Sequence, residues 1–130
     1  MTRRRPDDDR LRAVGVTLVL LVASLVPSPL ERHPGWEWVG PDKLLHLLGH
    51  AGYVVVLADA FDGSRRSRGE SAVLAVCVST AHSLLTARLQ TYVPGRMGET
   101  GDVVAGFVGA VVAASVWYRR VSPTRSVPER

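Results

Sequence analysis

The amino-acid sequence predicts an all-α membrane protein, a bundle of four transmembrane helices with both termini in the cytoplasm. Two observations predict it: charged residues are absent from four long stretches, and basic residues are concentrated in alternate connecting segments. The charge-free stretches are residues 13–30, 44–58, 71–87 and 103–118. Helices without a charged face need lipid around them, because a chain of 130 residues is too short to cover four of them with protein.

The predicted helices are slightly longer than these stretches, because a membrane span needs about 20 residues. The transmembrane domain is predicted at residues 13–118, and its helices, which extend two residues past each end, cover about 11–26, 43–61, 70–90 and 102–120. Residues 1–12 are predicted to form a basic cytoplasmic tail, and residues 121–130 a disordered cytoplasmic tail.

Proline and capping residues set the bounds of the predicted helices. Pro27 and Pro29 end the first helix, because proline cannot continue it. Asp42 directly follows Pro41 and is placed to cap the second helix, and Asp102 is placed to cap the fourth, since an aspartate side chain accepts hydrogen bonds from the first free backbone N–H groups.

The first stretch has an alternative interpretation as a cleaved signal peptide, because a basic segment precedes an apolar run. No small-x-small cleavage site follows it, and Pro27 and Pro29 crowd the place where one would lie. We therefore favour a retained first helix.

The basic residues predict the orientation. Twelve of the 16 lie in the N-terminal tail, the loop between the second and third helices, and the C-terminal tail. Because loops rich in Lys and Arg stay in the cytoplasm, these segments are predicted to be cytoplasmic and the two longer loops to face outward. The pI of about 10 is explained by arms that contact anionic lipid, and no nucleic-acid partner is predicted.

Polar side chains of the second and third helices fall on single helix faces. Asp42, His46 and His50 of the second helix are spaced four residues apart, so they share one face. His82, Thr86 and Gln90 of the third helix have the same spacing. Polar groups within a bilayer normally face the bundle interior or a water-filled cavity. We therefore expect an outward-facing polar site composed of Asp42, Lys43, His46, His50, His82, Gln90, Arg96 and Asp102.

Three interpretations of this site remain open. It can bind a small polar or amphipathic ligand, with Lys43 and Arg96 engaging carboxylate or phosphate. It can bind a metal through three histidines and Asp42, but two histidines four apart are a weak signal without the glutamate of a zinc-protease helix. In the third interpretation, the histidines bind no ligand and only form hydrogen bonds between helices. We predict neither a metal nor a cofactor.

The fourth helix carries small residues at four-residue spacing, at Ala105, Gly109 and Ala113, with Gly106 beside Ala110. Small residues at this spacing let helices approach closely in lipid. We favour packing within the bundle, and an oligomer formed through this face remains possible.

Two motifs resemble the VanZ-like family of small four-helix membrane proteins. Residues 42–46, Asp-Lys-Leu-Leu-His, resemble the start of that family's second helix. Residues 90–96, Gln-Thr-Tyr-Val-Pro-Gly-Arg, followed by Asp102 and Gly109, resemble its second signature. The likeness covers roughly residues 41–118. Two positions depart from the pattern: Ala87 stands where the family has glutamate, and Gly106 where it has asparagine.

The resemblance implies a multi-pass protein of the cytoplasmic membrane, associated through the family's namesake with resistance to the glycopeptide teicoplanin. We therefore expect a non-enzymatic protein that binds an envelope-related or lipid-linked ligand and modulates tolerance to cell-envelope agents. The alternatives are a membrane-embedded enzyme acting on a lipid or wall precursor, with His46 or His82 as general base, and a structural accessory subunit.

Overall fold

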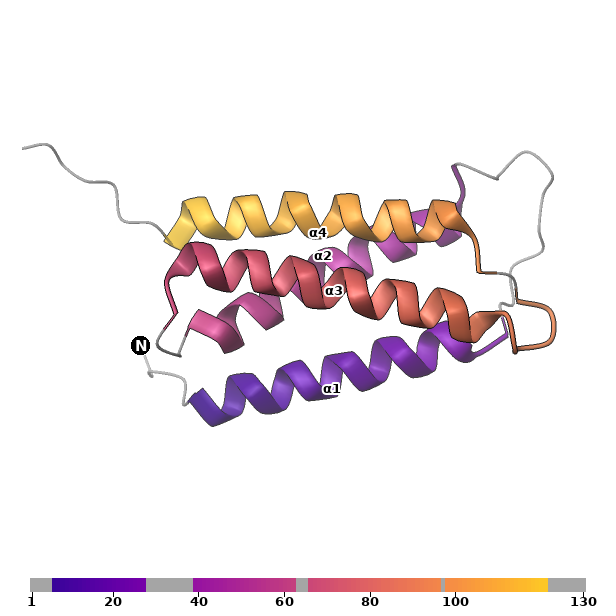
Figure 1. The fold of residues 1–130 in the computed structure, drawn as a ribbon, viewed down its shortest axis with the longest axis horizontal. Helices are drawn as coiled ribbons and strands as arrows, with labels where there is room; N and C mark the ends of the chain where they lie inside the picture. The colour runs from indigo at the N-terminus through magenta and orange to yellow at the C-terminus, as the bar shows by residue number, and fades with distance from the viewer. Residues whose placement is uncertain (1–5, 28–38, 63–65, 97, 122–130) are drawn as a thin grey trace, which may run out of the picture.

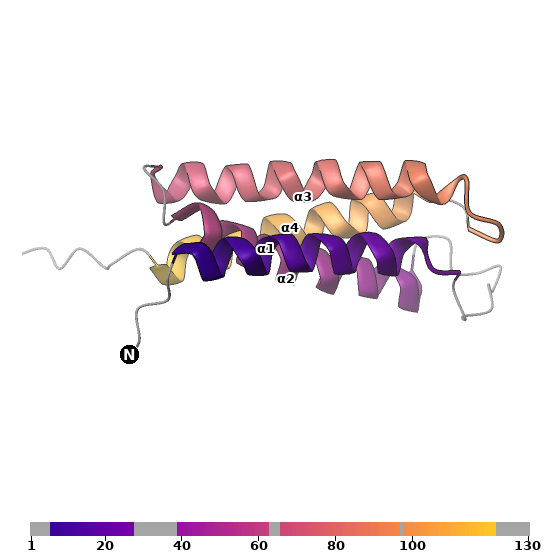
Figure 2. The same ribbon diagram turned by 90° about the horizontal axis from the view of Figure 1, so that it is seen from below.

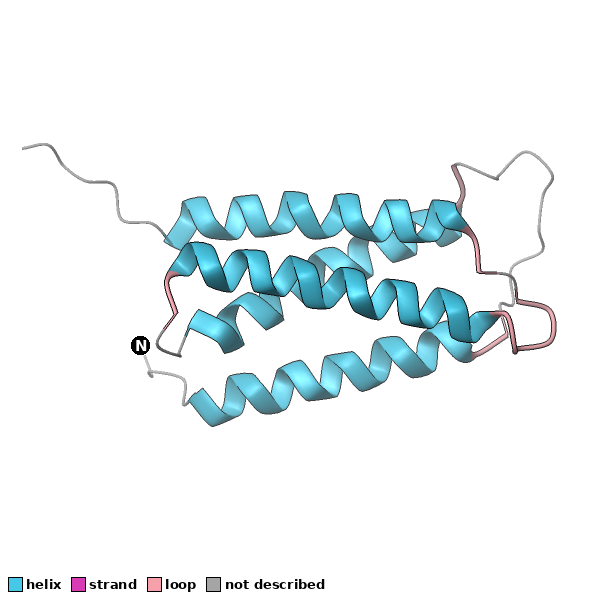
Figure 3. Ribbon diagram, viewed as in Figure 1, coloured by secondary structure: helices cyan, strands magenta, loops and turns pink. Residues whose placement is uncertain are grey.

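A computed structural model describes residues 6–27, 39–62, 66–96 and 98–121, and most of these residues fold into helices (Figure 3). The four helices are α1 (Pro6–Leu25), α2 (Pro41–Asp62), α3 (Arg68–Gln90) and α4 (Thr100–Val121). The predicted all-α fold with four helices is confirmed. Most of the loop predicted to face outward between α1 and α2 (residues 28–38), residues 1–5 of the predicted N-terminal tail, and the predicted C-terminal tail beyond residue 121 lie outside the described residues.

The four helices run side by side along the long axis of the molecule (Figures 1 and 2). α1 packs against α2 and α3, and α4 packs against the same two helices, whereas the described residues of α1 and α4 do not touch. The starts of α1 and α3 and the ends of α2 and α4 share one end of the bundle (Figure 1). We call it the basic end, because its described residues include Arg10, Arg12, Arg66, Arg68, Arg119 and Arg120.

Three helices are long and apolar enough to cross a membrane: α2, α3 and α4 over Thr100–Arg120. α1 differs because it begins at Pro6, inside the segment predicted as a tail. Proline fits the first helical position, and Asp7, Asp8 and Asp9 fill the first turn, where negative charge interacts favourably with the helix dipole. Sequence reasoning placed this start about five residues too late, because it followed the apolar residues alone.

The polarity of the bundle is the reverse of that of a water-soluble protein. Large apolar side chains cover its outside, including Leu18, Val22, Leu48, Val73 and Leu84, each more than half exposed. Its interior is mostly alanine and polar groups. The buried polar residues are Lys43, His50, Ser71, Ser79, His82, Ser83, Thr86, Gln90 and Asp102. A surface of this kind is compatible with contact to a lipid bilayer.

α2 and α4 approach most closely at the glycines of α4. A Cβ atom added to Gly109 would lie 2.1 Å from the backbone oxygen of Leu47, and one added to Gly106 would lie 2.9 Å from Cδ2 of His50. Gly106, Gly109 and Ala110 are all buried. The small residues of α4 are therefore used inside one chain, where they bring the second and third turns of α2 and α4 together.

Candidate functional site

The first turns of α2 and α4 build a charged cluster around Lys43. The Lys43 Nζ atom lies 2.8 Å from Oδ2 of Asp42 and 3.4 Å from Oδ1 of Asp102, and it donates a hydrogen bond to Glu99. Lys43 itself is only 6% exposed. A buried ammonium needs such partners, since an unpaired charge away from water is costly.

His46 extends this cluster by one helical turn. Its Nε2 atom lies 3.6 Å from Oδ2 of Asp102. Asp42, Lys43, His46, Glu99 and Asp102 are called the Lys43 cluster from here on. It contains three carboxylates against one ammonium, so with a neutral His46 its formal charge is negative. The cluster lies at the end of the bundle opposite to the basic end (Figure 1).

The carboxylates have the spacing of a metal site, but Lys43 stands among them. Oxygen atoms of Asp42, Glu99 and Asp102 lie within 4.8 Å of one another, and the Lys43 ammonium contacts all three residues. Among the described residues, the three carboxylates are the group whose spacing fits a metal ion, and no histidine belongs to this group. The Lys43 side chain therefore supplies the positive charge that a cation would bring.

A second, neutral cluster lies deeper in the bundle. His50 Nδ1 and Ser79 Oγ are 2.8 Å apart, and the rings of His50 and His82 are 5.9 Å apart. The edge of Tyr53 packs on His82 with a centroid distance of 5.3 Å, and its hydroxyl lies 2.8 Å from Oγ1 of Thr17. We call Thr17, His50, Tyr53, Ser79 and His82 the histidine core. It joins α1, α2 and α3 through side chains that carry no formal charge when the histidines are neutral.

His82 is the exception in this core. It is 8% exposed, and neither of its ring nitrogens has a hydrogen-bond partner among the described residues. The histidine core connects upward to the Lys43 cluster, because the His46 and His50 rings stack with centroids 6.3 Å apart. The polar interior is thus one continuous track from the cluster to mid-bundle.

Gln90 and Arg96 do not join either cluster, although both were predicted as site residues. The Gln90 amide donates to the Ser24 oxygen at 2.9 Å, and Arg96 Nε donates to the Val26 oxygen at 2.9 Å. Arg96 Nη2 also reaches the Ala23 oxygen at 3.4 Å. The last carbonyls of a helix lack partners within it, so these side chains cap α1 and attach it to α3.

No family model, no curated protein and no solved structure matches this chain. The chemistry of the site is therefore argued from its own residues. The predicted residues fall into three places: Asp42, Lys43, His46 and Asp102 in the Lys43 cluster, His50 and His82 in the histidine core, and Gln90 and Arg96 at the end of α1.

Sequence reasoning missed four residues of these clusters: Glu99, Thr17, Tyr53 and Ser79. Glu99 directly precedes α4, and its signal was its position three residues before Asp102 at the start of a predicted helix. Ser79 gave no signal, because serine is common among small packing residues. Gly106 was noted only as a small packing residue and as a departure from the family's asparagine, and the structure shows that it leaves the space that the His50 ring occupies.

Proposed function

We propose that the chain is a VanZ-like protein of the cytoplasmic membrane, with four spans, both termini in the cytoplasm and the Lys43 cluster facing outward. Its role is to bind an envelope-related or lipid-linked ligand at that cluster, and thereby to modulate tolerance to cell-envelope agents such as glycopeptides. The observation that carries the proposal is the Lys43 cluster itself, a charged group at the mouth of a polar track in an otherwise apolar bundle.

The orientation is supported by the placement of the arginines. Six described arginines, Arg10, Arg12, Arg66, Arg68, Arg119 and Arg120, lie at the basic end, whereas two, Arg88 and Arg96, lie at the end that carries the Lys43 cluster. Because basic segments stay in the cytoplasm, the cluster is assigned to the outer face. α1 is proposed as the fourth span, since Gln90 and Arg96 hold its end against α3 and its outward side chains, Leu18 and Val22 among them, are apolar.

The charges of the cluster favour a particular ligand chemistry. The sequence had suggested that Lys43 and Arg96 engage a carboxylate or phosphate of the ligand. Lys43 already has carboxylate partners, however, and Arg96 is bonded to α1, so neither is available for that role. The carboxylates exceed the ammonium in number and retain partial exposure: the side chains of Asp42 and Glu99 are 42% and 31% exposed. A ligand that presents an amine or several hydroxyl groups therefore complements the cluster better than an anion does.

The test compares two carboxylates at opposite ends of the bundle. In a strain lacking the chromosomal copy, we expect the wild-type gene to restore teicoplanin tolerance, and Asp102→Asn and His46→Ala to fail to restore it. Asp59→Asn is the matched control, because an asparagine oxygen can still accept the 2.8 Å hydrogen bond from Trp117 Nε1. Loss of tolerance in both cluster variants at normal membrane levels supports the site; full tolerance in both variants refutes it.

A second candidate, a membrane-embedded enzyme acting on a lipid or wall precursor, rests on the His50–Ser79 hydrogen bond. A histidine beside a serine hydroxyl is the arrangement of a base and its nucleophile. Ser79 is completely buried, however, and Gly106 brings α4 onto the His50 ring, so a substrate carbonyl has no access to the hydroxyl. If Ser79→Ala abolished the activity of the wild-type gene while leaving the thermal stability of the protein unchanged, this candidate would replace the first.

A further inference from the structure

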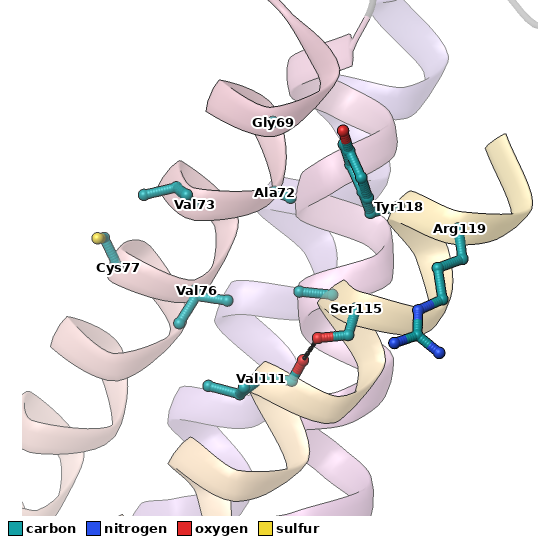
Figure 4. A pocket seen from close by; sticks show the side chains of 10 residues that line it. Gly69, Ala72, Val73, Val76, Cys77, Val111, Ser115, Tyr118 and Arg119 are labelled. Atoms are coloured by element: carbon teal, nitrogen blue, oxygen red, sulfur yellow. Dashed lines mark hydrogen bonds between the residues drawn. The ribbon is translucent and has the colours of Figure 1, made fainter. Parts of the chain in front are cut away.

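A groove of about 450 Å³ runs between α3 and α4 on the outer surface, near the basic end (Figure 4). It lies far along the bundle from the Lys43 cluster and shares no residue with it. Gly69 and Ala72 of α3 allow the groove to form, because neither carries a long side chain. Its sides include Val73, Val76 and Val111, and Tyr118 and Arg119 stand at one end.

The lining of the groove is apolar along its length and cationic at one end. Val73 is 65% exposed and Val111 39% exposed, so the groove opens toward the surroundings of the bundle. Ser115, the polar residue on its α4 side, donates its hydroxyl to the Val111 oxygen at 2.8 Å, which removes its donor from the groove. A long hydrocarbon chain with an anionic head matches this distribution.

Arg119 supplies the positive charge. It is exposed, and among the described residues no carboxylate lies within ion-pair distance of it. The carboxylate on the first turn of α3, Glu70, is turned toward Ser67, whose backbone N–H it accepts at 2.7 Å in a capping box. The Arg119 guanidinium is therefore free for a phosphate, which it can bind with two parallel N–H donors.

We propose that this groove binds one anionic phospholipid, with an acyl chain along Val73, Val76 and Val111 and the phosphate at Arg119. The charge at this end favours a lipid over a second copy of the chain. The Arg119 end lies with other arginines, where anionic headgroups of the same leaflet gather. The site is independent of the ligand proposed for the Lys43 cluster.

The single cysteine provides the test, because Cys77 lines this groove and is exposed. The full chain in dodecyl maltoside is titrated with phosphatidylglycerol or with phosphatidylcholine of the same chains, and the rate of Cys77 alkylation by N-ethylmaleimide is measured. Phosphatidylglycerol is expected to protect Cys77 at concentrations about fivefold lower than phosphatidylcholine, the preference expected for one basic side chain.

Three variants locate the preference. Arg119→Gln is expected to make the two lipids protect equally, Arg119→Lys to retain most of the preference, and Arg120→Gln, the adjacent arginine outside the groove, to behave as wild type. The proposal is overturned if the wild type shows no headgroup preference, if Arg119→Gln and Arg120→Gln weaken it equally, or if protection without added lipid rises with protein concentration, which would place a second copy in the groove. Circular dichroism confirms that each variant keeps its helices.

Discussion

The Lys43 cluster and the histidine core differ in how their buried polar side chains are paired. The Lys43 ammonium has three carboxylates for its three N–H donors, whereas His82 has no hydrogen-bond partner among the described residues. In the proposed membrane placement, the cluster lies where α2 and α4 begin, next to headgroups and water. The core then lies in the hydrocarbon region, where charged groups are expensive.

This difference indicates which of the two regions can exchange partners. The ligand proposed for the Lys43 cluster would replace one set of ionic contacts by another. Binding in the histidine core would require the opening of a tightly packed interior, where Tyr53 and Ser79 are almost completely buried. We therefore assign recognition to the cluster and helix attachment to the core.

The largest expected effect comes from removing the charge that holds the cluster together. Lys43→Met leaves three neighbouring carboxylates without their ammonium, and unfolding in lipid should become easier by about 3 kcal/mol, the lower end for breaking a buried pair because two of the carboxylates are partly solvated. The triple variant with Glu99→Gln and Asp102→Asn should recover most of this loss. Steric-trap unfolding measures the free energy of unfolding of the single and the triple variant. Equal stability of Lys43→Met and the wild type would show that the ionic contacts of Lys43 do not stabilise the fold.

The next effect concerns the space around His50. Gly106→Ala places a methyl group 2.9 Å from Cδ2 and 3.2 Å from Cγ of that ring, and we expect a loss of about 2 kcal/mol from overpacking. Gly52→Ala is the matched control on α2, because nothing lies within 4 Å of its added Cβ; it should be neutral or stabilising. The pair of unfolding free energies is compared in one detergent, and a harmless Gly106→Ala would contradict the packing described for α4.

A smaller effect, of opposite sign, is expected at the unpaired histidine. His82→Phe removes two unsatisfied nitrogens while keeping a ring against Tyr53, so stability should rise by about 1 kcal/mol. His50→Phe should instead lower stability, since it leaves the Ser79 hydroxyl without its partner. Thermal unfolding of both variants in bilayer discs checks the contrast; destabilisation of the protein by His82→Phe would indicate that His82 has a binding partner in the membrane.

The smallest effect lies at the edge of the core. Thr17→Val removes the 2.8 Å contact with the Tyr53 hydroxyl without changing the shape of α1, and hydrogen bonds between membrane helices contribute about 0.6 kcal/mol on average. A double-mutant cycle with Tyr53→Phe isolates this value. A coupling energy of zero would remove this contact from the attachment of α1.

Much of the fold was predictable, because the absence of charge from four stretches is enough to locate four apolar helices. Part of the site was predictable as well: four-residue spacing places Asp42 and His46 on one face of α2, and Asp102 at a predicted helix start. Gln90 and Arg96 were misplaced, because sequence does not show which side chain will reach the free carbonyls of α1. Glu99 and Ser79 were missed, because their roles depend on contacts between helices.

The central claim, an outward-facing Lys43 cluster in a membrane-embedded bundle, is tested most directly by cysteine accessibility in intact cells. In a Cys77→Ser background, Tyr92→Cys reports on the end that carries the cluster, since Tyr92 is 75% exposed in the turn after α3, and Arg66→Cys reports on the basic end. We predict that a membrane-impermeant maleimide labels position 92 in intact cells and position 66 only after permeabilisation. Labelling of position 66 alone in intact cells, or recovery of the protein in the soluble fraction, would contradict the account.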